Sequence, residues 1–125
     1  MLEKNWKETL TKEQYHVLRE KGTETPFEGK YVTYHEHGQY YCAGCGTLLF
    51  LSENKFDSGS GWPSFDQVAS SDTVELHEDT RGGMQRFEVI CKTCGGHLGH
   101  VFDDGPTKTG KRFCINSCVL NFKKT

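Results

Sequence analysis

Hydrophobic and polar residues follow a helical pattern in one stretch near the start of this 125-residue chain. From Thr11 to Lys21 the segment TKEQYHVLREK places its apolar side chains along one narrow stripe. Thr11 followed by Gln14 three residues on has the form of a helix N-cap, and Gly22 follows as a C-terminal stop. We therefore predict one helix that lies against the outside of a larger body.

Beyond residue 30 the pattern changes to short runs that are rich in β-branched and aromatic residues. Glycines separate these runs and interrupt the chain too often for long helices. We expect a mainly β fold in which residues 1–125 form a single domain and residues 1–30 form a helical segment packed on the β core. The predicted strands are Lys30–Tyr34, Tyr40–Cys42, Val74–His77, Arg86–Cys91 and Arg112–Phe122.

Composition narrows the classes of function. The chain has a net charge of −2, and its charged residues are interspersed rather than gathered in a basic stripe. This distribution argues against a nucleic-acid partner. No apolar run has the length of a signal peptide or a membrane span, so we expect a soluble, cytoplasmic protein without a membrane partner. We also expect a monomer. In such a protein, six cysteines indicate metal ligation or thiol chemistry rather than a disulfide scaffold.

Four of the six cysteines lie in two Cys-x-x-Cys-Gly elements, CAGCG at 42–46 and CKTCG at 91–95. Each element offers a pair of thiolates, and the glycine permits a tight turn. Four thiolates satisfy the tetrahedral coordination of Zn²⁺ and leave no open position, so the ion would be structural. A redox or buried thiol pair, or an iron–sulfur cluster, is the alternative. We predict one structural zinc ion held by Cys42, Cys45, Cys91 and Cys94.

The other two cysteines lie in KRFCINSCVLNF, where the apolar alternation slips near Ser117 and predicts a bulge or bend. Such a bend places Cys118 on the same face as Leu120 and Phe122, as an inert core thiol. If the segment stays extended, roughly 13 Å separates the two Cα atoms, too far for a disulfide between Cys114 and Cys118.

Cys114 falls on the opposite side of this strand from Phe113 and lies close to Lys111 and Arg112. These two cations favour the thiolate, the form of cysteine that acts as a nucleophile. The alternative is another buried thiol. Cys114 is therefore the candidate nucleophile.

His97 and His100 follow the second cysteine element directly, on what we interpret as a metal-tethered loop. Each ring could be a zinc ligand or a surface residue, and acid/base work gains weight because a spare cysteine is present. The glycine-rich segment FDSGSGWPSF at 56–65 carries aromatic residues that either plug a core edge or form an apolar wall for a ligand.

Taken together, CAGC, SGSGWPSF, CKTCGGHLGHVFDDGP and RFCINS resemble the signature of the methionine-R-sulfoxide reductase family, type B, over nearly the whole chain. The resemblance implies two antiparallel sheets with N-terminal helices, zinc on the two cysteine elements, and the nucleophile at Cys114. It places Trp62 against the methyl group of the substrate. Around the sulfoxide and the thiol it places His97, His100, Asp104, Arg112 and Asn116.

The activity implied is thiol-dependent reduction of methionine-R-sulfoxide, free or in proteins. Cys114 attacks the sulfur while His97 or His100 supplies a proton, and a sulfenic acid remains on the cysteine. Many relatives carry a resolving cysteine in the Gly-x-Gly-Trp-Pro loop, but this chain has Ser60 there, so we predict direct reduction by an external thiol such as thioredoxin. The alternatives are a zinc-scaffolded β binding module without catalysis and an oxidoreductase whose Cys-x-x-Cys elements cycle.

Overall fold

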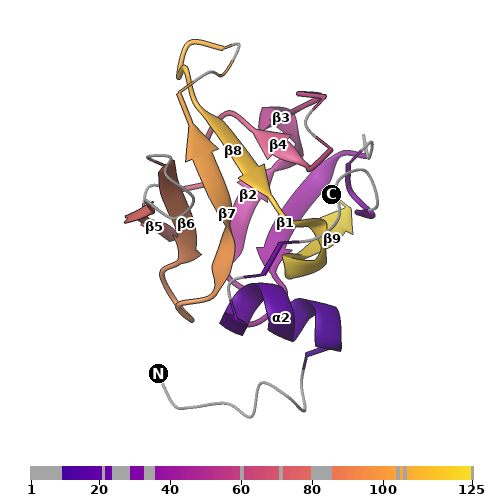
Figure 1. The fold of residues 1–125 in the computed structure, drawn as a ribbon. Helices are drawn as coiled ribbons and strands as arrows, with labels where there is room; N and C mark the ends of the chain where they lie inside the picture. The colour runs from indigo at the N-terminus through magenta and orange to yellow at the C-terminus, as the bar shows by residue number, and fades with distance from the viewer. Residues whose placement is uncertain are drawn as a thin grey trace.

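The structure, a computed structural model, describes residues 10–20, 22–23, 29–32, 36–59, 61–70, 72–79, 86–103, 105 and 107–124. Over these ranges one α-helix packs beside two antiparallel β-sheets (Figure 1). This arrangement confirms the prediction of a mainly β fold with two antiparallel sheets and an N-terminal helix.

The helix, α2, runs from Lys12 to Glu20 and has the ends that the sequence predicts. Thr11 Oγ1 accepts a hydrogen bond from the Gln14 backbone N at 3.1 Å, and Gln14 Oε1 accepts one from the Thr11 N at 3.0 Å. This reciprocal capping box satisfies two backbone donors that the first turn would otherwise leave unpaired. At the other end, the Gly22 N donates to the His16 carbonyl at 2.8 Å and ends the helix.

The strands form one sheet of three and one of six, all antiparallel. In the smaller sheet the order is β2 (Leu48–Leu51), β1 (Gly38–Cys42), β9 (Leu120–Lys124). In the larger sheet the order is β3 (Lys55–Phe56), β4 (Ser64–Phe65), β8 (Arg112–Ile115), β7 (His97–Phe102), β6 (Arg86–Cys91), β5 (Val74–Asp79).

An aromatic core joins the two sheets. Phe50 of β2 stacks on Phe65 of β4 with ring centroids 4.3 Å apart, and Tyr40 of β1 meets Phe65 edge to face at 5.2 Å. All three side chains are fully buried, and Val17 and Leu18 of α2 are buried at its margin. The narrow apolar stripe of the helix thus covers one end of the core, where α2 contacts β7.

Three of the predicted strands are confirmed, as β1, β5 and β6. The prediction of a strand at Lys30–Tyr34 is wrong for its described part, because residues 29–32 form a turn. The predicted run Arg112–Phe122 divides into β8 and β9, which belong to different sheets, with the 3₁₀ turn Ser117–Val119 between them. The slip in alternation near Ser117 marks this turn.

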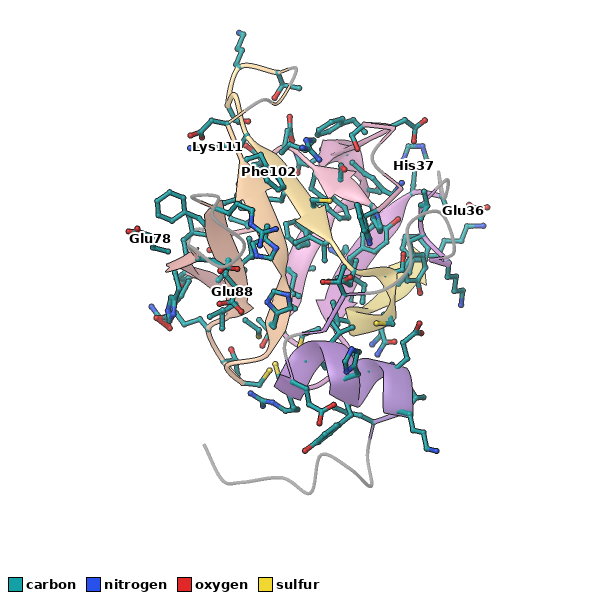
Figure 2. All side chains as sticks on the ribbon, in the orientation of Figure 1. Glu36, His37, Glu78, Glu88, Phe102 and Lys111 are labelled. Carbon is teal, nitrogen blue, oxygen red and sulfur yellow. The ribbon has the colours of Figure 1, made fainter. Side chains whose placement is uncertain are left out.

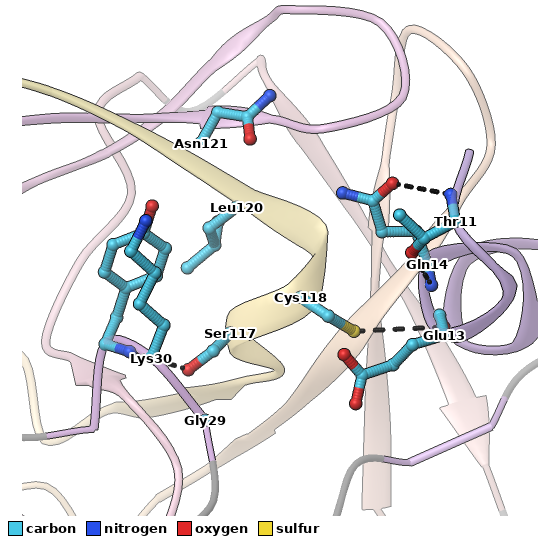
Figure 3. A pocket seen from close by; sticks show the side chains of 10 residues that line it. Thr11, Glu13, Gln14, Gly29, Lys30, Ser117, Cys118, Leu120 and Asn121 are labelled. Atoms are coloured by element: carbon cyan, nitrogen blue, oxygen red, sulfur yellow. Dashed lines mark hydrogen bonds between the residues drawn. The ribbon is translucent and has the colours of Figure 1, made fainter. Parts of the chain in front are cut away.

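The 3₁₀ turn also corrects the prediction for Cys118. Its thiol is only partly buried and lies 3.9 Å from the Glu13 carbonyl of α2, rather than inside the core beside Leu120. Cys118 lines a pocket of about 420 Å³ between the first turn of α2 and residues 117–121 (Figure 3). The turn breaks the period of two on which the core placement rested.

Candidate functional site

Two hairpin turns bring four cysteines to one point between the sheets. Cys42 ends β1 and Cys91 ends β6, while Cys45 and Cys94 lie in the turns that follow. The four sulfurs all lie within 4.8 Å of one another, with Cys42 3.8 Å from Cys94 and Cys45 3.5 Å from Cys91. Zinc–sulfur bonds of about 2.3 Å at tetrahedral angles separate the sulfurs by about 3.8 Å. The four-cysteine cluster therefore has the size of a tetrahedral metal site.

The two turns are alike. Gly46 follows Cys45 with φ of 81° and Gly95 follows Cys94 with φ of 75°, and this left-handed conformation is the one that glycine adopts without strain. Each glycine N donates to the carbonyl of the first cysteine of its pair, at 2.8 Å for Gly46 and 2.7 Å for Gly95. The glycines therefore close each loop so that both thiols point to the same spot, as the sequence predicts.

Crowding alters the acidity of these thiols. The pKa of Cys94 is lowered to about 4, because the Cys42 and Cys91 thiols donate hydrogen bonds to its sulfur. The pKa of Cys42 is raised, because its hydrogen bonds to Cys91 and Cys94 and its burial favour the protonated form. Four thiolates this close repel one another, so shared protons or a cation must hold them together.

The helix α2 packs directly on this cluster. Arg19 Nη1 donates to the Cys94 carbonyl at 3.0 Å. A β-carbon at Gly96 would lie 2.6 Å from Leu18 Cδ2 and 3.3 Å from Cys94 Sγ. The helix α2 therefore packs closely against the second cysteine turn.

A different part of the larger sheet holds the fifth cysteine. The register pairs Glu88 of β6 with His100 of β7, His100 with Cys114 of β8, and Cys114 with Ser64 of β4. Directly paired residues direct their side chains to the same face of a sheet. We call these four residues the thiol row. Glu88 and Phe102, which lie on strands β6 and β7 of this face, are labelled in Figure 2.

The two histidines belong to strand β7, so the prediction that they lie in a loop is wrong. A bulge explains how residues three apart share a face: the register runs from Ile90 opposite His97 to Val89 opposite Gly99, leaving one extra residue on β7. His97 and His100 then face the same way, with ring centroids 5.4 Å apart. The bulge brings together side chains that regular alternation would separate.

Each histidine forms a hydrogen bond with a buried carboxylate that was not among the site residues predicted from the sequence. His97 Nδ1 lies 2.6 Å from Glu88 Oε2, and His100 Nε2 lies 2.8 Å from Asp79 Oδ2. Glu88 is 3% exposed and Asp79 is 5% exposed, so water contributes little to the solvation of either carboxylate. A usable signal existed in the sequence, since Glu88 interrupts the otherwise apolar run FEVI.

Two further predicted site residues, Arg112 and Asn116, lie close to Cys114 on and directly after strand β8. Arg112, paired with Phe102, lies over that aromatic ring at 4.6 Å and is two residues from Cys114. Asn116 is buried, and its Nδ2 donates to the Leu98 carbonyl at 2.9 Å, which ties the end of β8 to the β7 bulge. These contacts hold the strand that carries Cys114 against β7.

Trp62 lies near the β4 end of the thiol row, two residues before Ser64. Its carbonyl accepts a hydrogen bond from Ser64 Oγ at 3.2 Å. Its side chain is partly exposed. Asp104 and Ser60 lie outside the described residues.

Among the residues that the structure describes, no helix has the length and apolar character needed to cross a membrane.

Fold and site together define a class: a mainly β protein with four cysteines clustered at metal-binding distance and a separate cysteine–histidine centre on its larger sheet. The model of the SelR domain family matches residues 10–124. The chain therefore belongs to the SelR domain family, as the resemblance in its motifs predicts.

Relatives of the chain carry names that agree with this family. A peptide methionine sulfoxide reductase MsrB of Methanosarcina barkeri is 62% identical over 121 residues, which are 97% of this chain and 85% of the relative. The MsrB of Leptospira interrogans is 52% identical over 98% of this chain and 93% of its own length. The methionine-R-sulfoxide reductase B3, mitochondrial, of Mus musculus is 58% identical over 90% of this chain and 45% of its own length.

Proposed function

We propose that this protein reduces the R epimer of methionine sulfoxide with Cys114 as its nucleophile and an external thiol as its reductant. Membership of the family makes it an oxidoreductase acting on methionine sulfoxide. The observation that carries the finer proposal is the register of the larger sheet, which sets His100 directly opposite Cys114. A thiol and a group able to exchange a proton are thus neighbours on one face.

In the proposed reaction the Cys114 thiolate attacks the sulfoxide sulfur while the sulfoxide oxygen takes up a proton. The attack forms a transient bond between the Cys114 sulfur and the substrate sulfur. The oxygen then moves to the Cys114 sulfur as a hydroxyl group, both the S–O bond and the transient S–S bond to the methionine sulfur break, and methionine leaves while Cys114 remains as a sulfenic acid. The proton comes from His100 or His97, and Arg112 favours the thiolate by its positive charge two residues away. Two thiol equivalents then reduce the sulfenic acid, releasing water and forming a disulfide.

The substrate would lie across the face between Trp62 and the histidines. An aromatic ring offers an apolar contact for the methyl group of methionine sulfoxide, which would distinguish one epimer from the other. Asn116 holds the Cys114 strand through its bond to Leu98, and Asp104 stays a predicted member of the site.

An external reductant is proposed because the other thiols have different surroundings. Cys42, Cys45, Cys91 and Cys94 are held in the cluster. Cys118 lies on the turn beyond β8, beside α2, with its sulfur 3.9 Å from the Glu13 carbonyl. Ser60 stands where many relatives have a resolving cysteine. A thioredoxin-like dithiol is the reductant that this arrangement calls for.

The metal of the four-cysteine cluster is proposed to be Zn²⁺ in a structural role. Four thiolates of tetrahedral size leave no open position for substrate or water. The cluster joins β1 of the smaller sheet to β6 of the larger one, and the bound ion would add binding free energy to the stability of the fold.

The experiment follows methionine release from each sulfoxide epimer, with dithiothreitol as reductant. Wild type should turn over the R epimer and leave the S epimer unchanged, and Cys114→Ser should lose activity by about a thousandfold or more. Cys118→Ser is the matched control and should retain activity. No release from either epimer by folded, metal-loaded wild type would contradict the proposal and favour a binding module.

A further inference from the structure

The larger sheet buries two carboxylates that no motif of the sequence singles out, Asp79 on β5 and Glu88 on β6. An ionised carboxylate is unfavourable in such a place unless hydrogen-bond donors or cations surround it. Each of the two has a histidine of β7 within hydrogen-bond distance. The carboxylates and histidines form two pairs, Glu88 with His97 and Asp79 with His100.

The two pairs use different ring nitrogens. Glu88 Oε2 lies 2.6 Å from His97 Nδ1. An ionised carboxylate can only accept hydrogen bonds, so the nitrogen that faces it carries the proton. In its neutral form His97 is therefore protonated at Nδ1, and its lone pair lies on Nε2.

The second pair is reversed. Asp79 Oδ2 lies 2.8 Å from His100 Nε2, and Arg86 Nη2 lies 3.7 Å from the same carboxylate oxygen. The guanidinium favours the ionised form of Asp79, which then accepts the Nε2 proton. Neutral His100 therefore has its lone pair on Nδ1, while its neighbour His97 has the opposite tautomer.

We propose that Asp79 and Glu88 are positioning residues that hold the two histidines of β7 in opposite tautomers, so that the ring opposite Cys114 presents Nδ1. The catalytic consequence rests on the proposed function. A ring fixed by a buried partner meets the thiol and the sulfoxide oxygen in one orientation. Glu88 acts through His97 and Asp79 through His100.

Nuclear magnetic resonance of the ¹⁵N-labelled, metal-loaded wild type tests the tautomers directly. Long-range ¹H–¹⁵N correlations distinguish Nδ1–H from Nε2–H rings, and His97→Gln and His100→Gln assign the two signals among the six histidines. We expect Nδ1–H for His97 and Nε2–H for His100. Asp79→Asn should shift the His100 pattern and leave that of His97, and Glu88→Gln should do the reverse.

Turnover of methionine-R-sulfoxide by the same variants tests the catalytic role. Asp79→Asn should lower kcat by about tenfold or more with KM changed by less than about twofold, because an amide can donate as well as accept and so no longer fixes the proton on His100 Nε2. Glu75→Gln is the matched control, since Glu75 is a half-exposed carboxylate on the same strand. It should leave kcat and both histidine patterns unchanged.

The outcomes separate this inference from the proposed function. Opposite tautomers in a wild type that releases no methionine would retain the pairing and overturn the reductase. The same tautomer for both histidines, or a folded Asp79→Asn with wild-type kcat and an unchanged His100 pattern, would overturn the inference even in an active enzyme. If Asp79→Asn does not fold, the wild-type spectrum alone still decides the tautomers.

Discussion

The four-cysteine cluster and the thiol row differ in how the chain assembles them. The cluster comes from two copies of one local device, a strand end, a Cys-x-x-Cys turn and a glycine of positive φ. The thiol row comes from four different strands, and each strand supplies one residue through its register. The cluster therefore depends on local sequence and the row on long-range pairing, which predicts different responses to substitution.

Loss of a cluster ligand should have the largest effect on stability. Cys91→Ser removes one of the four sulfurs of the cluster that joins the two sheets. In small peptides a structural zinc ion contributes on the order of ten kcal/mol of binding free energy, which is comparable with the free energy of unfolding of a whole domain. We expect the variant to be unfolded or to melt far below the wild type in thermal denaturation followed by circular dichroism.

The matched comparison is Cys114→Ser, which lies in the thiol row. It should melt within a few degrees of the wild type, because its side chain is only partly buried and serine is close to cysteine in size. If Cys91→Ser kept its metal and melted like Cys114→Ser, the division between a stabilising cluster and a reactive row would be wrong.

Gly99→Ala should affect both stability and activity, because it acts on the pairing itself. A β-carbon at Gly99 would lie 2.0 Å from the Cys114 carbonyl oxygen, so β7 and β8 would have to separate. We expect a loss of about 2 kcal/mol or more in urea denaturation, and a fall in kcat/KM of about a hundredfold from the displaced His100–Cys114 geometry. Unchanged stability would show that the two strands do not approach as closely as the register implies.

Arg19→Ala should have the smallest effect and should be confined to the cluster. It removes the hydrogen bond from α2 to the Cys94 carbonyl, worth about 1–2 kcal/mol. Thermal denaturation should show this loss, and metal transfer to a chelator should become faster while kcat stays at the wild-type value. A change in kcat without a change in the rate of metal release would show that Arg19 acts on the thiol row rather than on the four-cysteine cluster, and would contradict this prediction.

Features with a local signal could be predicted from the sequence. The capping box at Thr11 and the stop at Gly22 identify α2, and the two glycine-closed turns identify the cluster. The opposite sides of Phe113 and Cys114 also follow from alternation: Phe113 is buried and Cys114 is partly exposed. These features depend on residues within a few positions of one another.

Features that depend on distant pairing could not be predicted. Strand β7 reads HLGHVF, and its glycine and two histidines give no clear strand signal, although four of its six residues are buried. Its bulge, which aligns His97 with His100, arises from the pairing with β6. Glu88 has a local signal, since it interrupts the apolar run FEVI, but its histidine partner and the role of Asp79 become evident only once β5, β6 and β7 are in register. The partial burial of Cys118 could not be predicted either, because a short 3₁₀ turn, rather than a simple bend, follows Asn116.

The central claim is that the cysteines divide their tasks, with four holding a metal and Cys114 taking the oxygen of the sulfoxide. One equivalent of methionine-R-sulfoxide is added to metal-loaded protein without reductant, and the product is trapped with a sulfenic-acid reagent and mapped by mass spectrometry. The account predicts one methionine released per protein, one oxygen of about 16 Da on Cys114 before trapping, and the metal retained. Oxidation within the four-cysteine cluster, with metal release and an unmodified Cys114, would contradict it.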